Sequence, residues 1–519
     1  MKKLLLSSAI ALLASQTALA DLNLNGSILD PLSADLRQQT AYDFREQAAN
    51  QHLLASPVIQ TNNGDEKQVS NFYGQFSKSL PHDSQGKVDS SAYSHLLAAI
   101  KAGSFEAFEA VPAGGPVKLA NPLAAQVYDL EGRDSHAYAI KPAPKLASAE
   151  AAAEMVELFG HALLRDVPFS AYTSHPQVAA VAKTLAGLDD FNGPVTTDSL
   201  FRGGFDGDFN GPYISQFLYQ DIPAGPKVYN QKYTGYTAQN FMTHFKEWLA
   251  IENGNNPTAS VTTTLEHYMI NGRDLARYVH KDFSYQAFQN AALILLSWGS
   301  NVMDDGNPYK TATRQGAFVD LGAPEVLDMV ARAANGGLRA AWYQKWNVHR
   351  RLRPEEYAGV AISKPGLVNA QFFAADMVKA VIAENGTALL PMAYPEGAPT
   401  HPAYPAGHAS IAGASVTVLK AFFKEDASLP KAYGPNDDGS QLVSLGNSVS
   451  LTVGGELNKL ATNISLGRDW AGVHYRSDGI QGLLLGEQVG IAVLQDWRKA
   501  HPKQPAFTLK KFNGEEIQI

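Results

Sequence analysis

Cysteine is absent from all 519 residues of the chain. Its absence excludes disulfide bonds, thiolate metal sites and a cysteine nucleophile. It also leaves no thiol that an oxidant can convert to a sulfenic acid or a disulfide. We therefore expect packing, bound ions or oligomerisation to stabilise the fold.

Long apolar runs are also scarce. The run at the N-terminus, Leu4 to Leu13, follows Lys2 and Lys3, and the segment ends in Ala18-Leu-Ala20. It is shorter than the roughly 20 residues that a membrane-spanning helix needs. Its charged start and Ala-x-Ala end are typical of a secretory signal peptide. The sequence therefore predicts a signal peptide over 1–20 and an exported protein, either periplasmic or secreted.

Positive charge is outweighed by negative charge. The chain has 42 Lys and Arg against 50 Asp and Glu, a formal net charge of −8. Loss of the two signal-peptide lysines, Lys2 and Lys3, changes −8 to −10. An acidic protein is a poor partner for nucleic acids and anionic membranes, so we expect neither. Any anion site must then be a local basic cluster.

Strand patterns are rare as well. Glycine and proline clusters break up residues 21–148, which we expect to form an irregular region that wraps the body. Apolar residues at helical spacing predict a helix from Ala149 to Leu164, and the same pattern continues after it. Further helices are expected at 237–251, 274–280, 284–298, 324–334, 337–352, 367–385, 408–424, 441–465 and 474–498. Alternation about Asn513-Gly514 predicts a C-terminal β-hairpin. The predicted fold is mainly α, with helical bundles in a body over 149–519.

Basic residues occur at three predicted helix ends between residues 340 and 480. The first group is Lys345, His349 and Arg353, followed by Pro354. Eight residues turn a helix by about 800°, so Arg353 lies about 80° from Lys345, and His349 shares that side. Pro354 disfavours helical backbone at Arg353 and predicts the helix end there. Such a run is also typical of a solvated surface favoured by the helix dipole.

The second group is the stretch His401-Pro-Ala-Tyr-Pro-Ala-Gly-His408. Its two prolines disfavour a helix, and a helical pattern begins after Gly407. Free N–H groups at a helix start favour an anion, and His408 adds a titratable group. The alternative is an ordinary helix cap.

The third group is Arg468, His474 and Asp478. Six residues turn a helix by about 600°, which separates Arg468 from His474 unless Gly467 and Gly472 bend the chain. Asp478 lies four residues after His474, one turn along the same predicted helix. It is expected to accept a hydrogen bond from the imidazole and fix its tautomer. The alternative is a core histidine beside a salt bridge.

The three groups complement one another chemically. Cations and a backbone donor can neutralise an oxyanion; these are Lys345, Arg353, Arg468 and the Gly407 N–H. The histidine held by Asp478 can bond the central atom as nucleophile or ligand. His408 can act as general acid–base.

The order Lys-(x7)-Arg-Pro, Pro-Ala-Gly-His and Gly-Arg-(x5)-His resembles the vanadium-dependent haloperoxidases. Their wider superfamily includes type 2 phosphatidic-acid phosphatases and bacterial acid phosphatases. The finer resemblance is to algal-type bromoperoxidases, on residues 345–355, 401–408 and 468–478. Shorter similar stretches occur at 200–203, 211–217 and 507–512. The resemblance thus extends from about residue 195 to the C-terminus.

The resemblance implies one vanadate per subunit, bonded through a ring nitrogen of His474. Its equatorial oxygens would be held by Lys345, Arg353, Arg468 and the Gly407 N–H. His408 would hydrogen-bond the apical oxygen and transfer a proton, while His401 would tune halide oxidation. Trp342 would line the pocket, unless it is plain core packing, and His349 would lie behind the site.

One residue departs from the family pattern. The usual serine before Gly-His is Ala406 here. The backbone N–H remains, but one hydroxyl-to-oxyanion hydrogen bond, worth about 1.5–3 kcal/mol, is lost. We therefore expect weaker vanadate binding or slower turnover, and an altered halide preference.

The resemblance implies a secreted enzyme that uses hydrogen peroxide and vanadate to oxidise halide, with bromide expected, for transfer to a small organic acceptor. Vanadate would act as a Lewis acid. The alternatives are an acid phosphatase with a phosphohistidine at His474, because phosphate and vanadate are isosteric, and a non-catalytic anion binder. Seven residues between Lys345 and Arg353, against six in the phosphatases, favour the haloperoxidase. Relatives form dimers or larger rings, which implies a homo-oligomer.

A structural calcium ion is a further candidate. Some algal-type enzymes bind a cation near the position of Asp304-Asp-Gly-Asn307. This segment is far from an EF-hand, and the alternative is a polar turn.

Overall fold

A computed structural model describes residues 34–446, 449–501 and 506–519. The predicted signal peptide, residues 1–20, lies outside these ranges. Among the described residues, no helix has the length and apolar character needed to cross a membrane. The chain divides into two units, Met1–Ser56 and Pro57–Ile519. The described part of the first unit contains helix α2 (Ala34–Leu54).

The second unit begins with short helices joined by loops. Their bounds are α3 (Asp65–Gln68), η1 (Ser70–Phe72), α4 (Ser90–Ala102), α5 (Phe105–Glu109), η2 (Pro122–Gln126) and η3 (Ser135–Ala137). Asp89 begins α4 by accepting a hydrogen bond from the Ala92 N–H. Such side-chain caps satisfy N–H groups that have no acceptor within the helix.

The longer helices begin at α6 (Ala149–Leu164), which has the bounds predicted from the sequence. The Ser148 side chain caps it by accepting from the Ala151 N–H. Further along lie η4 (Phe169–Ala171), α7 (Pro176–Ala186), η5 (Gln216–Leu218), α8 (Phe245–Glu252), α9 (Gly272–Lys281), α10 (Gln286–Ser297), η6 (Gly299–Val302) and η7 (Pro308–Lys310). They are followed by α11 (Ala323–Tyr343), η8 (Gln344–His349), α12 (Pro354–Ser363), η9 (Pro365–Leu367), α13 (Gln371–Ala374) and α14 (Asp376–Asn385).

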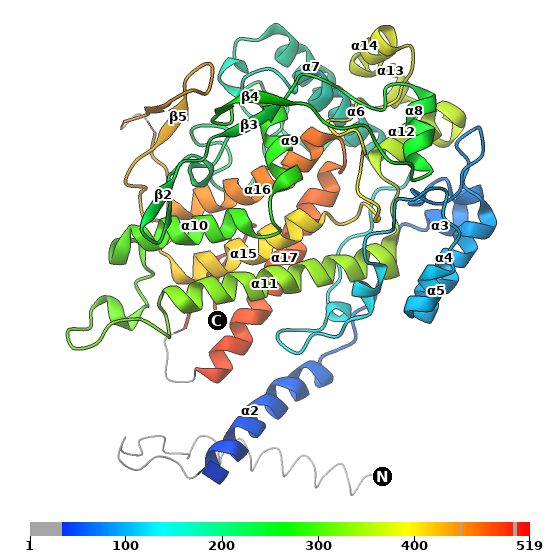
Figure 1. Cartoon of the computed structure of the whole chain (residues 1–519). Coiled ribbons are helices and arrows are strands. Elements are labelled where there is room, and N and C mark those ends of the chain that lie inside the picture. Colours follow the sequence, from blue (N-terminus) through cyan, green and yellow to red (C-terminus); the bar gives the residue numbers. More distant parts are fainter. Residues whose placement is uncertain (1–33, 447–448, 502–505) are drawn as a thin grey trace, which may run out of the picture. The chain divides into compact units, whose positions relative to one another are not determined.

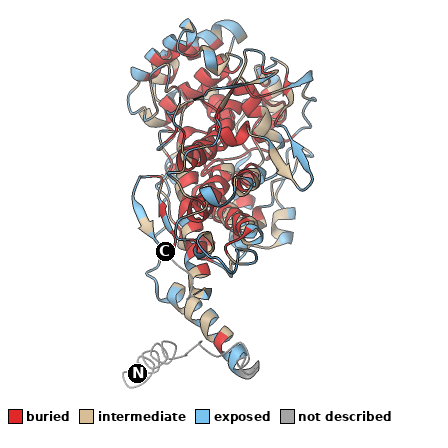
Figure 2. Ribbon diagram, turned by 90° about the vertical axis from the view of Figure 1, so that its left-hand side faces the viewer, coloured by how far each residue is buried: buried red, intermediate tan, exposed pale blue. Residues whose placement is uncertain are grey.

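The core of this unit is a helical bundle. Helix α15 (Gly407–Phe422) packs against α11, α16 (Val453–Ala471) and α17 (Arg476–Ala500) (Figure 1). Buried residues gather along these helices (Figure 2). Glycine lets α15 and α17 approach backbone to backbone. A Cβ atom added at Gly413 would clash with the Leu483 carbonyl, and one at Gly486 with the Ser410 carbonyl.

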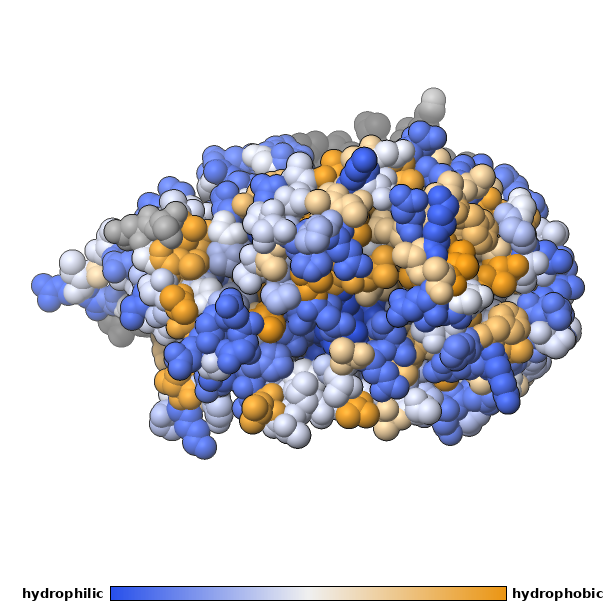
Figure 3. Space-filling view, turned by 90° about the horizontal axis from the view of Figure 1, so that it is seen from above, coloured by the Kyte–Doolittle hydropathy of each residue, from blue (hydrophilic) through white to orange (hydrophobic). Residues whose placement is uncertain are grey.

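The surface of this unit seen from above is mostly hydrophilic, with hydrophobic groups scattered between (Figure 3). It is hollowed near the middle of this face, where hydrophilic side chains lie at the bottom. Scattered apolar groups of this kind are ordinary on protein surfaces.

Strands are few and short in the described chain. Four antiparallel pairs occur: β1 (Ile222–Ala224) with β2 (Lys227–Tyr229), β3 (Tyr233–Tyr236) with β4 (Thr262–His267), β5 (Tyr433–Pro435) with β6 (Leu442–Ser444), and β7 (Thr508–Lys510) with β8 (Glu516–Gln518). The last pair places Leu509 opposite Ile517, and Gly514 has a φ of 82° in its turn. The predicted mainly α fold and C-terminal hairpin are thereby confirmed.

Several of the predicted helices were wrong in part. Only 245–251 of the 237–251 prediction is helical, because the Thr237 N–H donates to the Val261 carbonyl and Phe241 pairs with Met392 before α8 begins. The helix predicted over 441–465 starts later, because 442–444 pairs with β5 and the Thr452 hydroxyl caps α16. The two helices predicted over 324–352 form one helix, α11, which passes into a π-helical turn.

Candidate active site

Three buried cations lie near one another without a carboxylate partner. Lys345 belongs to the π-helical turn η8, Arg353 precedes α12, and Arg468 lies on α16. Lys345 and Arg353 are completely buried, and Arg468 is almost so. None of the three forms an ion pair with any carboxylate of the described chain. Buried charges are costly unless paired, so this cluster calls for an anion.

Lys345 has room for one more acceptor. Its ammonium donates to the carbonyls of Pro402 at 2.6 Å and Ala403 at 2.7 Å. An ammonium has three donors, so one remains for a ligand. Burial, followed by the charges of Arg353 and Arg468, holds the pKa of Lys345 well below its usual value. A bound anion would counter both effects and favour the protonated lysine.

Arg353 joins the two loops that carry the other predicted residues. Its Nε donates to the His401 carbonyl at 2.8 Å, and Nη1 donates to the Val473 carbonyl at 2.8 Å. Nη1 also lies 2.9 Å from His474 Nε2. Because a guanidinium only donates, this ring nitrogen carries a lone pair. The Arg353 N–H is fixed by Glu356 Oε2 at 2.6 Å.

The other ring nitrogen of His474 is held by Asp478. Nδ1 lies 2.8 Å from Asp478 Oδ2, and both side chains are buried. The proton therefore resides on Nδ1. Burial and the charges of Arg353 and Lys345 keep the pKa of His474 well below its usual value, so the ring stays neutral. A neutral imidazole whose Nε2 carries a lone pair can bond a central atom in place of the Arg353 N–H.

The path by which Asp478 reaches His474 differs from the prediction. His474 is not helical, because Tyr475 is the N-cap of α17 and Asp478 lies in the first turn. Asp478 Oδ2 accepts from the Tyr475 N–H at 3.2 Å as well as from His474. The predicted contact is present, but it arises as a helix-start capping arrangement.

The predicted bend between Arg468 and His474 occurs at Gly472. This residue has a φ of 84° and ends α16, which turns the chain back toward Arg468. The predicted bend at Gly467 is wrong, because Gly467 lies inside α16. There it makes room for Val279, which a Cβ atom would approach to 2.9 Å.

Arg468 offers an unused donor. Its Nη1 donates to the Val279 carbonyl at 2.7 Å, and the guanidinium lies 5.7 Å from the ring centre of Tyr394. Its Nε is buried and has no hydrogen-bond partner within the described chain. Buried donors without acceptors are rare, and an oxyanion would satisfy this one.

Helix α15 begins beside this cluster. Ala406 is its N-cap and has no hydroxyl, while its backbone N–H donates to the Asp478 carbonyl at 2.9 Å. Gly407 is the first helical residue, so its N–H has no acceptor within the helix. A Cβ atom at Gly407 would lie 3.2 Å from the Trp342 ring. Glycine therefore lets the start of α15 lie close to the Trp342 ring.

His408 is the most accessible of the site histidines, with its side chain 26 % exposed. Its Nε2 lies 3.1 Å from Oδ1 of Asp282, which is the C-cap of α9 and has a buried side chain. Asp282 is not among the site residues predicted from the sequence. No local pattern indicates it, because this contact joins residues 126 positions apart.

His401 and Trp342 form one wall of the site. Their ring centres are 4.6 Å apart, and the Trp342 Nε1 donates to backbone carbonyls at Ala120 and Asn121. Burial, followed by Arg353 and Lys345, holds the pKa of His401 well below its usual value. Trp342 thus contacts His401, a predicted site residue, and also the loop that contains Ala120 and Asn121.

His349 is not part of this hydrogen-bond network. Its ring packs edge-on against Tyr404, with ring centres 4.8 Å apart. Neither ring nitrogen has a hydrogen-bond partner within the described chain. Burial lowers the pKa of His349 to about 3.

Two further residues orient the site and escaped the sequence analysis. Arg351 donates to Asp478 Oδ1 at 2.7 Å and to Glu154 Oε2 at 2.9 Å. Its guanidinium lies 3.7 Å from the ring centre of Tyr475. Arg351 belongs to the basic run around Lys345, and that run indicated this part of the site. Glu154 gave no such indication, because it lies far away in the sequence, on α6. Both oxygens of Asp478 are therefore occupied by donors.

The predicted calcium turn is held by lysines. Asp305 accepts from Lys310 and, at 2.8 Å, from Lys424. Asp304 Oδ1 accepts from the Gly306 N–H at 2.8 Å. A cation would have to compete with these donors, and calcium at this turn remains a prediction.

Comparison with known proteins points to one family. The family described as the VCPO second helical-bundle domain matches residues 326–501. A vanadium-dependent bromoperoxidase from Ascophyllum nodosum is 36 % identical, covering 94 % of both chains. One from Corallina pilulifera is 33 % identical, covering 93 % of this chain and 98 % of its own. The homohexameric structure of the second vanadate-dependent bromoperoxidase from Ascophyllum nodosum has a TM-score of 0.90, with 32 % identity and coverage of 97 % and 95 %.

Proposed function

The chain belongs to the vanadium-dependent bromoperoxidase family, and we propose that its cluster of buried cations binds vanadate and uses hydrogen peroxide to oxidise bromide to hypobromous acid. The observation that carries the proposal is the arrangement around His474. Three buried cations without carboxylate partners surround a neutral imidazole whose Nε2 carries a lone pair. This donor set suits a tetrahedral oxyanion with a central atom that accepts nitrogen.

The residues present fit vanadate. Its oxygens would be held by the third donor of Lys345, the guanidinium groups of Arg353 and Arg468, and the Gly407 N–H. His474 Nε2 would be the ligand to vanadium. When bound, vanadate supplies a Lewis acid that activates hydrogen peroxide without a change in its own oxidation state. Lys345 would use its third donor to stabilise negative charge on an oxygen held beside it.

His408 would handle the protons of the reaction. It is partly exposed, so it can exchange protons with solvent, and Asp282 holds its Nε2. An oriented imidazole can take a proton from incoming peroxide and return it to the departing oxygen as water. Asp282 acts as a positioning residue because it contacts His408 and none of the three cations through a hydrogen bond or ion pair.

Halide would react beside His401 and Trp342. The two ring centres lie 4.6 Å apart and His401 is buried, so this wall presents aromatic surface. A partly desolvated halide is a better nucleophile than a hydrated one, so this wall would favour oxidation of bromide. The small organic acceptor would then meet the oxidised halogen at or outside the site.

The acid phosphatase is the second candidate, because phosphate has the same shape as vanadate and His474 can act as a nucleophile. The deciding experiment is bromination of phenol red by the purified mature chain, with hydrogen peroxide and bromide, with and without orthovanadate. We expect a vanadate-dependent signal that disappears in His474→Ala. No bromination by protein that binds vanadate, together with hydrolysis of p-nitrophenyl phosphate, would establish the phosphatase instead. Bound anion without either reaction would establish the non-catalytic binder.

We further propose that the protein assembles with copies of itself and is exported. The Ascophyllum nodosum structure is a homohexamer, which supports a homo-oligomer here. The basic start and short apolar run of residues 1–20 support export. Light scattering after size exclusion would give the mass of the assembly. N-terminal sequencing of protein recovered outside the cytoplasm should begin at Asp21.

A further inference from the structure

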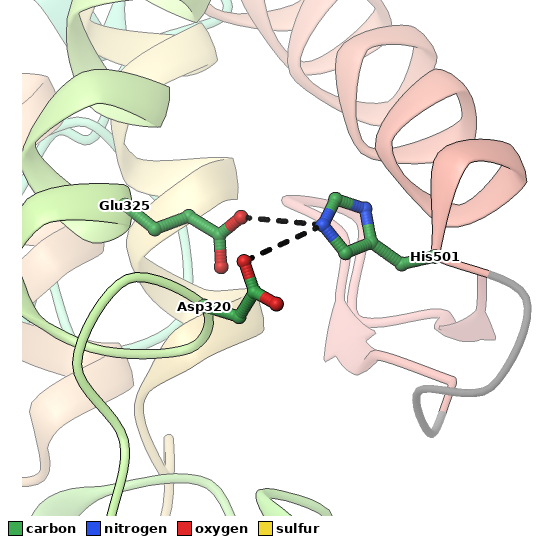
Figure 4. A group of neighbouring side chains, drawn as sticks. All are labelled: Asp320, Glu325 and His501. Atoms are coloured by element: carbon green, nitrogen blue, oxygen red, sulfur yellow. Dashed lines mark ion pairs between the residues drawn. The ribbon is translucent and has the colours of Figure 1, made fainter. Parts of the chain in front are cut away.

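A second group of metal-ligating side chains lies away from the cation cluster. It comprises Asp320 in the loop before α11, Glu325 in the first turn of α11, and His501 at the end of α17 (Figure 4). Helices α11 and α17 have 21 and 25 residues. They are therefore about 32 and 38 Å long. Lys345 follows the other end of α11, and His474 precedes the other end of α17.

The spacing within this group is that of ligands around one ion. His501 Nε2 lies 3.9 Å from Asp320 Oδ1 and 3.8 Å from Glu325 Oε1. Hydrogen bonds from nitrogen to oxygen are about 2.7–3.2 Å long, so the ring donates to neither carboxylate. Two atoms that are each about 2.0–2.2 Å from one zinc ion are at most about 4.4 Å apart. Both distances from His501 Nε2 are thus compatible with one coordinated ion, and the three ligand atoms lie within 4.8 Å of one another.

The imidazole is already oriented for coordination. His501 Nδ1 lies 2.8 Å from the Trp497 carbonyl, one turn earlier. Because a carbonyl only accepts, Nδ1 carries a proton, and Nε2 is the ring nitrogen that faces the two carboxylates. The ring also stacks on the Trp497 indole, with ring centres 4.0 Å apart and planes 10° apart. An imidazole whose distal N–H is bound to a backbone carbonyl is the usual arrangement of a metal-ligating histidine.

Glu325 is also held in place from outside the group. Its Oε2 accepts from the Leu321 N–H at 2.6 Å, and its Oε1 accepts from the Trp497 indole N–H. Trp497 therefore positions two of the three ligands, one through its carbonyl and one through its ring. Asp320 is partly exposed and leaves a side of the gap open to water. Water can complete the coordination there.

The chemistry of the donors selects the ion. Two carboxylates and a neutral imidazole carry a net charge of −2, which one divalent cation neutralises. Calcium and magnesium prefer ligand sets made of oxygen, whereas zinc readily combines imidazole with carboxylate. We propose that Asp320, Glu325 and His501 bind one zinc-class divalent cation that fastens the start of α11 to the end of α17. This structural site is separate from the vanadate site and does not depend on it.

The test is calorimetric titration of zinc chloride into the full mature chain prepared without vanadate. We expect one saturable equivalent in the wild type that is lost in His501→Ala. The matched control is His136→Ala, which removes an exposed histidine beside Asp134 and should retain that equivalent. Equal stoichiometry in wild type and His501→Ala, or no saturable binding by the wild type, would overturn the proposal.

Cobalt gives an independent readout of the same site. One equivalent of Co²⁺ should produce a visible d–d absorption band in the wild type and the His136→Ala control, and none in His501→Ala. If His501→Ala fails to fold, Asp320→Asn at the partly exposed position serves the same purpose, with at least a tenfold weaker zinc affinity expected. Calcium that displaces zinc at equal concentration would overturn the assigned ion class. Saturating zinc should also raise the wild-type Tm by roughly 3 °C.

Discussion

His474 Nδ1 lies 2.8 Å from Asp478 Oδ2, while the other oxygen of this carboxylate lies 2.7 Å from Arg351 Nη1. Asp478 thus fixes the histidine tautomer from a position that is itself fixed. All three side chains are buried, so each contact forms in a medium where charges are weakly screened. The ability of Nε2 to act as a ligand depends on this chain of contacts.

Asp478→Asn should weaken vanadate binding by about 10–100-fold, because the amide no longer fixes the proton on Nδ1 and removes one of the two carboxylate partners of Arg351. The measurement is bromination rate against orthovanadate concentration. Asp376→Asn, which changes an exposed aspartate on α14, is the control and should behave as wild type. An unchanged half-saturating vanadate concentration in Asp478→Asn would contradict the role of this carboxylate.

Ala406→Ser should tighten vanadate binding by about tenfold, because a hydroxyl at the N-cap of α15 can add a charge-assisted hydrogen bond to the oxyanion. Half-saturation of bromination by vanadate, together with calorimetry, measures the change. Ala409→Ser is the matched control, since Ala409 is buried on the same helix but beyond its cap. Equal gains in the two variants, or no gain at Ala406, would remove the explanation based on the cap.

Asp282→Asn should lower kcat of bromination by roughly tenfold while changing vanadate affinity much less. The reason is that Asp282 contacts His408, the proposed general acid–base, and does not pair with the three cations. The variant is compared with His408→Gln and with the double variant. If the fold-loss in kcat of the double variant equals the product of the fold-losses of the two single variants, the residues act independently.

His349 should make folding stability depend on pH. Burial lowers its pKa to about 3, whereas an unfolded histidine has a pKa of about 6.5. Between these values the unfolded chain binds a proton that the folded chain does not, so stability falls as pH falls. The slope from this group reaches about 1.4 kcal/mol per pH unit.

The comparison is urea unfolding of wild type and His349→Gln between pH 6 and pH 4, where the variant should show the flatter dependence. His95→Gln changes a histidine exposed on α4 and is the control. Identical pH slopes for wild type and His349→Gln would show that His349 is not held neutral by the fold.

The sequence located most of the site because its residues sit at helix ends that local chemistry marks. Pro354 indicates where one helix ends, Gly407 indicates where another begins, and Gly472 indicates where the chain turns back. The bounds of α6 were predictable for a similar reason, because Ser148 caps an apolar helical pattern. Local signals of this kind need no knowledge of distant parts of the chain.

What the sequence could not predict depends on contacts between distant segments. Asp282 meets His408, and Glu154 meets Arg351, only after the helices have packed. The π-helical turn that carries Lys345 likewise has no sequence pattern distinct from an ordinary helix. The strand at 442–444 was mistaken for helix because short apolar runs fit both periods.

The glycine contacts between α15 and α17 determine how the site responds to change. His408 lies at the start of α15 and Asp478 in the first turn of α17, and the two backbones touch at Gly413 and Gly486. Main-chain atoms in direct contact leave no side-chain layer through which one helix can slide along the other. The relative position of His408 and Asp478 is therefore set by main-chain contacts between the two helices. Trp342, in the proposed halide wall formed with His401, can therefore be substituted without changing the relative position of His408 and Asp478.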